Sequence, residues 1–301
     1  MAPSRLVVSS ALMVLCAIWG STWLVIRRGL EDLPPFTAAA VRFTVASLVM
    51  VLVAKPLHAK EGGAAPSFGL VATMGCLNFA CSYGIVYWAE TVIPSGLASV
   101  LWAVFPMMMA VLGHVFLPGE QLRRRHWAGF AVGFLGVALL FRTDLAIIGP
   151  AAIGVGLVYF VSPLVSAIGQ TVIKRHGEHT SSVLLNRNAM FVGAVLLWAV
   201  ALLFERDEPI AWTRFAIFSV AYLSIMGTVV TFGLYYWLLR YMAAHRLSLI
   251  AYVIPAIALF LGWAIGDEAV GLDTLGGTAL ILGGVAMIAQ RRPAASQSSL
   301  E

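Results

Sequence analysis

The chain has 301 residues, of which 60% are hydrophobic and only 11% are charged, and its formal net charge is +5. A soluble globular domain carries about 25% charged residues, so this composition excludes an ordinary water-soluble protein and predicts a chain embedded in a lipid bilayer. The positive charge is spread over many short connections. We therefore interpret it as setting the orientation in a membrane, not as a nucleic-acid site.

Ten apolar segments divide the chain, and a membrane-spanning helix takes about 20 such residues. They lie at residues 6–27, 34–54, 68–89, 94–117, 125–142, 147–174, 180–204, 212–239, 246–266 and 271–290. Pro, Gly or charged residues separate them, and the connections are too short for a catalytic domain. The predicted fold class is thus an all-α integral membrane protein with ten transmembrane helices. We expect residues 293–301 to form a disordered tail that ends in a cloning scar.

The distribution of basic residues predicts the orientation. With the amino terminus in the cytoplasm, connections on that side carry 12 Lys and Arg residues and those opposite carry 5, while Arg42 and Arg187 lie inside helices. Because cytoplasmic connections of membrane proteins are enriched in Lys and Arg, both termini are predicted to be cytoplasmic.

The second half of the sequence repeats the first in degenerate form. Residues 83–106 align without a gap on residues 232–255, so that Trp88 falls on Trp237 and Pro106 on Pro255. This predicts two repeats, residues 1–145 and 146–292, with five helices each. Because five is odd, the second repeat must be inverted relative to the first, as in many secondary transporters. The alternative is chance matching of Gly, Pro and aromatic residues within apolar sequence.

Several of these motifs resemble a known family. They are WGSTW at 19–23, YWAE at 87–90, PSGLASVL at 94–101, Glu120, and the spaced glycines Gly129 and Gly136. Together they resemble the EamA type of the drug/metabolite transporter superfamily, and within it the YddG-type exporters of aromatic amino acids. The resemblance implies a bacterial inner-membrane carrier with a central cavity. In one departure, the second half has Ser166-Ala167 where the first has Trp19-Gly20.

Aromatic and hydroxyl side chains that share helix faces predict the substrate site. Trp102 lies at helical spacing from Ser99, and Tyr252 from Ser248, so each face combines a ring with a hydroxyl group. Such a face suits a cavity that stacks a flat apolar group, although interfacial aromatic belts and helix–helix hydrogen bonds are the alternatives. The predicted substrate-binding residues are Trp19, Asn78, Ser82, Tyr83, Ser99, Trp102, Tyr159, Gln170, Tyr235 and Tyr252. Pro106, Pro163 and Pro255 are predicted hinges, because a proline inside a helix bends it.

No motif for catalysis, phosphate binding or metal binding is present, so we predict no enzyme activity, no cofactor and no metal site. Acidic residues all lie in connections or near helix ends, with Glu90 the nearest to a buried position. This favours a neutral, zwitterionic or weakly anionic small molecule over a cationic drug. Arg42 and Arg187 are interpreted as scaffold residues, with substrate-anion sites as the alternative.

The predicted function is therefore alternating-access export of aromatic amino acids or similar hydrophobic metabolites by a monomer or weak dimer in the bilayer, without nucleic-acid partners. The alternatives are exchange of nucleotide sugars or phosphorylated metabolites, and a membrane binding protein or channel subunit that transports nothing by itself.

Overall fold

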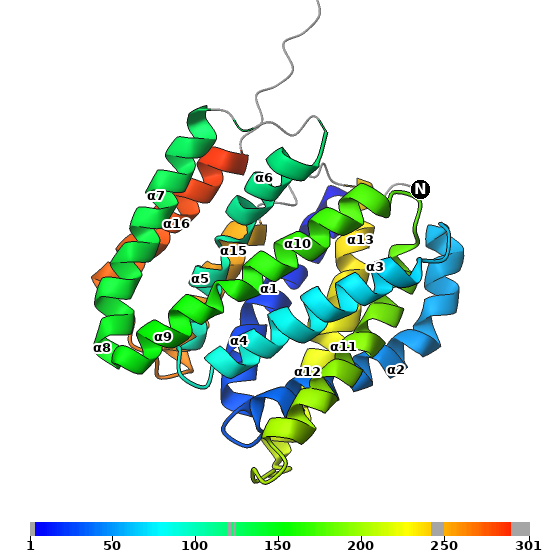
Figure 1. Ribbon diagram of the computed structural model, residues 1–301, viewed down its shortest axis with the longest axis horizontal. Helices are drawn as coiled ribbons and strands as arrows, with labels where there is room; N and C mark the ends of the chain where they lie inside the picture. Colours follow the sequence, from blue (N-terminus) through cyan, green and yellow to red (C-terminus); the bar gives the residue numbers. More distant parts are fainter. Residues whose placement is uncertain (1–3, 119–121, 123, 242–249, 290–301) are drawn as a thin grey trace, which may run out of the picture.

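The computed structural model describes residues 4–118, 122, 124–241 and 250–289, and helices dominate this part of the chain (Figure 1). The chain first forms α1 (Arg5–Gly29), α2 (Pro35–Glu61), α3 (Phe68–Thr73), η1 (Met74–Ser82), α4 (Tyr83–Ala89), α5 (Ser95–Trp102), α6 (Phe105–Phe116), α7 (Arg124–Leu140), η2 (Phe141–Leu145) and α8 (Ala146–Ile148). The rest forms α9 (Pro150–Tyr159), α10 (Val161–His176), α11 (Ser182–Phe204), α12 (Arg214–Ser224), η3 (Ile225–Val230), α13 (Thr231–Tyr241), α15 (Ile250–Ala264) and α16 (Leu272–Ala289).

Eight helical stretches are long and apolar enough to cross a membrane, and two shorter apolar helices, Val253–Ala264 and Leu272–Met287, accompany them within the described residues. Large apolar side chains on the outer surface, such as Leu52, Leu203 and Phe204, are 75–79% exposed. A surface of this kind requires lipid as its solvent. The chain is a multi-pass integral membrane protein.

Side-chain caps mark the start of several helices. The hydroxyl groups of Ser67, Ser181 and Thr213 each accept a hydrogen bond from a main-chain N–H in the first turn of α3, α11 and α12. Ser and Thr favour this position because they satisfy N–H groups that have no partner within the helix. Tight boundaries of this kind keep the connections short.

The boundary between the fifth and sixth predicted segments is later than predicted. The chain stays helical through η2 and α8 as far as Ile148, and it turns at Gly149, where φ is 124°. Glycine adopts this conformation without the steric cost that a Cβ atom imposes. The charged residues Arg142 and Asp144, which suggested an earlier end, lie within η2.

Two antiparallel helix pairs form the sides of the molecule. α7 and α16 lie side by side at one edge in Figure 1, and α2 packs along α11. The α7–α16 pair can approach this closely because Gly136 has no side chain. A Cβ atom at this position would lie only 2.6 Å from the main-chain oxygen of Gly277. Small residues allow this approach in membrane proteins, where close packing stabilises helix association.

Three of the predicted continuous helices contain wider π-helical segments, which the sequence did not predict. η1 lies between α3 and α4, η2 between α7 and α8, and η3 between α12 and α13. π-helical segments are rare and often occur at functional sites. Two of them carry residues discussed below, Asn78 in η1 and Thr228 in η3.

Candidate functional site

Five half-buried aromatic side chains, which we call the ring group, form two neighbouring sets along α1. Trp23 of α1 contacts the Trp102–Phe105 pair of α5 and α6, and Trp19 of α1 contacts Tyr235 of α13. The Trp102 ring stacks on Phe105 with centroids 4.8 Å apart, and the Trp23 ring lies 6.5 Å from Trp102. The rings of Trp19 and Tyr235 are 5.8 Å apart. These separations are those of favourable aromatic contacts.

Hydroxyl and amide groups of α10 and η1 continue from the ring group. The Trp102 indole N–H donates to the Ser162 hydroxyl at 3.3 Å, and this hydroxyl lies 2.9 Å from that of Ser82. The Asn78 amide donates to the main-chain oxygen and to the hydroxyl of Ser166, at 3.2 and 3.0 Å. The structure thus joins Trp102 and Ser82 through the Ser162 hydroxyl and holds Asn78 separately on Ser166, four residues further along α10.

Other predicted residues have different surroundings. Tyr159 is fully buried and donates to the Ala98 main-chain oxygen at 2.9 Å, and Ser99 donates to the Gly96 oxygen of its own helix. Tyr83 packs on Phe43, with centroids 4.9 Å apart, instead of joining the ring group. Gln170 is half-buried, and the side chain of Tyr252 lies outside the described part of the structure.

Two ring-group members, Trp23 and Phe105, were not among the predicted residues. Trp23 follows Trp19 by four positions and Phe105 follows Trp102 by three. Side chains with these spacings share a helix face, so the same pattern that selected Trp19 and Trp102 also contained the signal for their neighbours.

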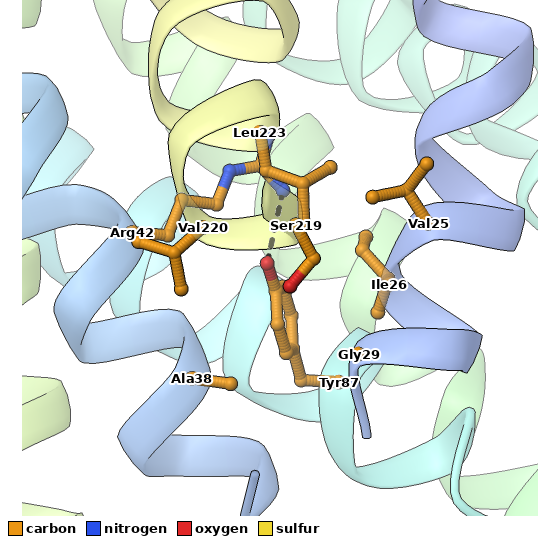
Figure 2. A pocket seen from close by; sticks show the side chains of 9 residues that line it. All are labelled: Val25, Ile26, Gly29, Ala38, Arg42, Tyr87, Ser219, Val220 and Leu223. Atoms are coloured by element: carbon orange, nitrogen blue, oxygen red, sulfur yellow. Dashed lines mark hydrogen bonds between the residues drawn. The ribbon is translucent and has the colours of Figure 1, made fainter. Parts of the chain in front are cut away.

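Arg42 lies in the interior, with only 2% of its surface exposed. Its guanidinium group donates to the Thr228 hydroxyl at 3.2 Å and to the Tyr87 hydroxyl at 3.3 Å, and it lies 4.9 Å from the Tyr83 ring centroid. Figure 2 shows Arg42 and Tyr87 at a small cavity of about 10 Å³ between α1, α2, α4 and α12. This volume is near the lower limit for one water molecule.

Ion pairs and helix caps close the end of the molecule at which α1 finishes and α2 begins, which we call the Glu90 face. Arg28 pairs with Asp267 at 3.3 Å. Both carboxylate oxygens of Glu268 accept main-chain N–H groups at the start of α5, from Ser95 at 2.7 Å and from Gly96 at 2.9 Å. The connection between α15 and α16 is thereby fastened to α1 and α5.

Glu90 directly follows the span that ends at Ala89, and its side chain is fully buried. Burial raises the pKa of Glu90 well above its usual range and the Glu268 carboxylate raises it further, whereas Arg27 and Arg42 act in the opposite direction. A buried carboxyl group without a hydrogen-bonding partner is stable only in its neutral form. The sequence singled out Glu90 as the acidic residue nearest to a buried position, and the structure shows that its side chain is fully buried.

Two of the predicted hinge prolines follow breaks in the helices. α5 ends at Trp102, four residues before Pro106, and α9 ends at Tyr159, four residues before Pro163. The proline ring clashes with the carbonyl group four residues earlier, which explains both positions. Pro255, in contrast, lies inside the continuous helix α15. Whether these sites bend during function stays a prediction.

Among the described residues, no group of three or more His, Cys, Asp or Glu side chains is placed to hold a metal ion. The arrangement offers rings, hydroxyl groups and an amide, which suit binding of an organic molecule with a flat apolar part.

Comparison with known proteins connects this architecture to transport. The chain is 28% identical over 269 residues to the "Uncharacterized inner membrane transporter YedA" of Escherichia coli, covering 86% of this chain and 82% of that protein. It is 25% identical over 294 residues to the "Probable terminal-alkyne amino-acid exporter" of Streptantibioticus cattleyicolor, covering 93% of each. One solved crystal structure has the same fold, with a TM-score of 0.63 at 20% identity over 94% of this chain and 96% of that one.

A family model matches the chain twice in succession, over residues 8–142 and again over residues 152–290. The two matches together span nearly all of the described helices, from α1 to α16. The relatives are likewise named as transporters and are matched over most of their own length. This chain therefore belongs to the EamA-like transporter family.

Proposed function

We propose that this transporter exports amino acids with aromatic or similarly hydrophobic side chains across the bacterial inner membrane, by alternating access between two inverted five-helix halves. Both termini are cytoplasmic in this proposal, so that the Glu90 face is the outer face. One relative is named as a probable amino-acid exporter and another as an inner-membrane transporter, which supports the class of substrate and the location.

The ring group carries the proposal. Trp102 belongs to the first matched segment, and it stacks on Phe105 while donating a hydrogen bond to Ser162 of the second. A half-buried ring that joins the two segments is suited to stack a substrate ring, and the neighbouring hydroxyl groups are suited to bond a polar end. Binding there lets one molecule influence the position of both halves.

Closure of the Glu90 face supports the alternating-access part of the proposal. The contacts of Arg28 with Asp267 and of Glu268 with the start of α5 join the first matched segment to the second. They must break for a path to open on this side. Pro106 and Pro163, beside the helix breaks, are the proposed hinges, together with Pro255.

Counterflow in proteoliposomes tests the proposal. Vesicles loaded with unlabelled phenylalanine or tryptophan are expected to take up the labelled amino acid. Trp102→Ala should raise the KM by about tenfold, because a lost aromatic contact costs on the order of 1.5 kcal/mol. Trp127→Ala is the matched control, because Trp127 lies on α7 with 60% of its surface exposed. Absence of counterflow, or equal changes in both variants, would refute the proposal.

The alternatives predict different results. A carrier of nucleotide sugars or phosphorylated metabolites would use Arg42 and Arg187 to bind anions, and sugar nucleotides would then compete with the amino acid. The Arg42 guanidinium is already bonded to Thr228 and Tyr87, which disfavours this function. Ligand binding without flux would instead indicate a binding protein or a channel subunit. A monomer or weak dimer is sufficient, because the ring group lies within one chain.

A further inference from the structure

Glu90 is an acidic residue that neither the fold nor the ring group explains. Its side chain is completely buried, and neither carboxyl oxygen has a hydrogen-bonding partner within the described structure. Buried polar side chains nearly always have partners, and a buried carboxylate without one is costly. A proton on Glu90 removes that cost.

Five titratable or charged groups lie within electrostatic range of Glu90: Arg27 of α1, Arg42 of α2, Tyr87 of α4, Tyr159 of α9 and Glu268 of the α15–α16 connection. None of them neutralises a Glu90 carboxylate directly. Arg27 donates to the main-chain oxygen of Glu90, and Arg42 donates to Tyr87 and Thr228.

The Glu268 carboxylate, in contrast to that of Glu90, has a hydrogen-bonding partner for each oxygen. Its two oxygens accept N–H groups at the start of α5, where the helix dipole favours a negative charge. The two carboxyl groups therefore differ: the oxygens of Glu268 are bonded to main-chain N–H groups, whereas those of Glu90 have no partner. The Glu268 carboxylate raises the pKa of Glu90, which favours a proton on Glu90.

We propose that Glu90 is a proton-binding site of the outer gate, loaded when the gate closes and emptied when it opens. The proposal rests on the alternating-access function above. On opening, water reaches the carboxyl group, its O–H bond breaks, and the proton passes to water on the Glu90 face. On closing, a proton from the same side returns to the carboxylate.

The consequence is a pH-dependent gate. Over the pH range in which Glu90 is ionised in the open state but protonated in the closed state, the closed state holds one proton more. The ratio of open to closed molecules then rises with pH by up to tenfold per pH unit. Because Glu90 lies at one end of the molecule, only the pH on that side controls the gate.

Distances between two spin labels test this without any substrate. One label is attached at Thr91 and one at Leu272, both exposed on the Glu90 face, after Cys16, Cys76 and Cys81 have been replaced by alanine. Between pH 5 and pH 9, double electron–electron resonance should show a longer distance whose population grows with pH.

Glu90→Gln should hold the short distance at every pH, because the amide has no proton to lose. Glu208→Gln, which changes an exposed carboxylate on the same face, should keep the pH response. Two results would overturn the proposal: a distance distribution of the parent that does not change with pH, or a Glu90→Gln protein with an unchanged pH response. The absence of a pH response in the parent refutes the proposal even if the variant does not fold. A pH response in a protein that moves no amino acid would refute only the proposed substrate.

Discussion

Replacement of Glu205 by alanine is expected to destabilise the protein by about 3 kcal/mol, because a buried N–H group that loses its partner costs on the order of 1–3 kcal/mol. Glu205 follows α11 and is 7% exposed. Its carboxylate accepts the main-chain N–H groups of Phe36 and Thr37 at the start of α2, each at 2.7 Å, and also the Thr37 hydroxyl at 2.7 Å. Alanine leaves the two N–H groups unpaired.

Glu61 provides the matched comparison at the opposite end of the same helix pair. It ends α2 and accepts the Val183 N–H group at 3.1 Å and the hydroxyl groups of Ser181 and Ser182 at the start of α11. Glu61 is only half-buried, and hydroxyl groups can turn towards water. Glu61→Ala is therefore expected to cost about 1 kcal/mol, in the range of an ordinary helix cap.

Unfolding of the purified variants in mixed micelles measures both changes. Glu205→Gln keeps one oxygen as an acceptor. Its free energy of unfolding should fall by about 1.5 kcal/mol, half the loss expected for Glu205→Ala. Glu208→Ala, exposed near the same face, should be neutral within about 0.5 kcal/mol. If Glu61→Ala is as destabilising as Glu205→Ala, burial does not determine the strength of these caps and the reasoning fails.

Two further changes are expected to have defined effects in the same unfolding assay. Gly136→Ala should cost about 1–3 kcal/mol, because its Cβ atom would meet the Gly277 oxygen and separate α7 from α16. Gly283→Ala, which meets no atom within 4 Å, should be neutral or slightly stabilising, and equal losses in both would contradict the close packing. Tyr159→Phe should cost about 1–2 kcal/mol by removing the buried hydrogen bond to Ala98, and an unchanged stability would argue against that bond.

Helix positions were predictable because length and apolar character alone determine them in a bilayer. The segment predicted at residues 180–204 is α11, Ser182–Phe204, and the segment predicted at residues 68–89 ends at Ala89 as expected. The π-helical segment η1 was not predictable, because most of its residues are apolar and the rotation that one extra residue causes is hidden in such a sequence.

The candidate site was predictable in part. Trp102 was selected from its helix face, but its hydrogen bond to Ser162 joins residues 60 positions apart and depends on how α5 and α10 pack. Ser162 was not among the predicted substrate-binding residues. For Glu90 the sequence gave the position at a helix end, whereas its neighbours Arg27 of α1 and Glu268 of the α15–α16 connection are far from it in sequence and depend on how the helices pack.

The reciprocal caps of α2 and α11 bear on the proposed inverted repeats. Glu61 at the end of α2 caps the start of α11, and Glu205 at the end of α11 caps the start of α2. A two-fold rotation that exchanges α2 and α11 therefore places one glutamate cap on the other. Glu61 and Glu205 lie outside the aligned residues 83–106 and 232–255, so this symmetry is independent of that sequence match. A pair fixed at both ends resists sliding, because any shift along its axis breaks one cap or the other. We therefore expect α2 and α11 to stay together as a rigid unit while α1, α5 and the α15–α16 connection separate at the Glu90 face.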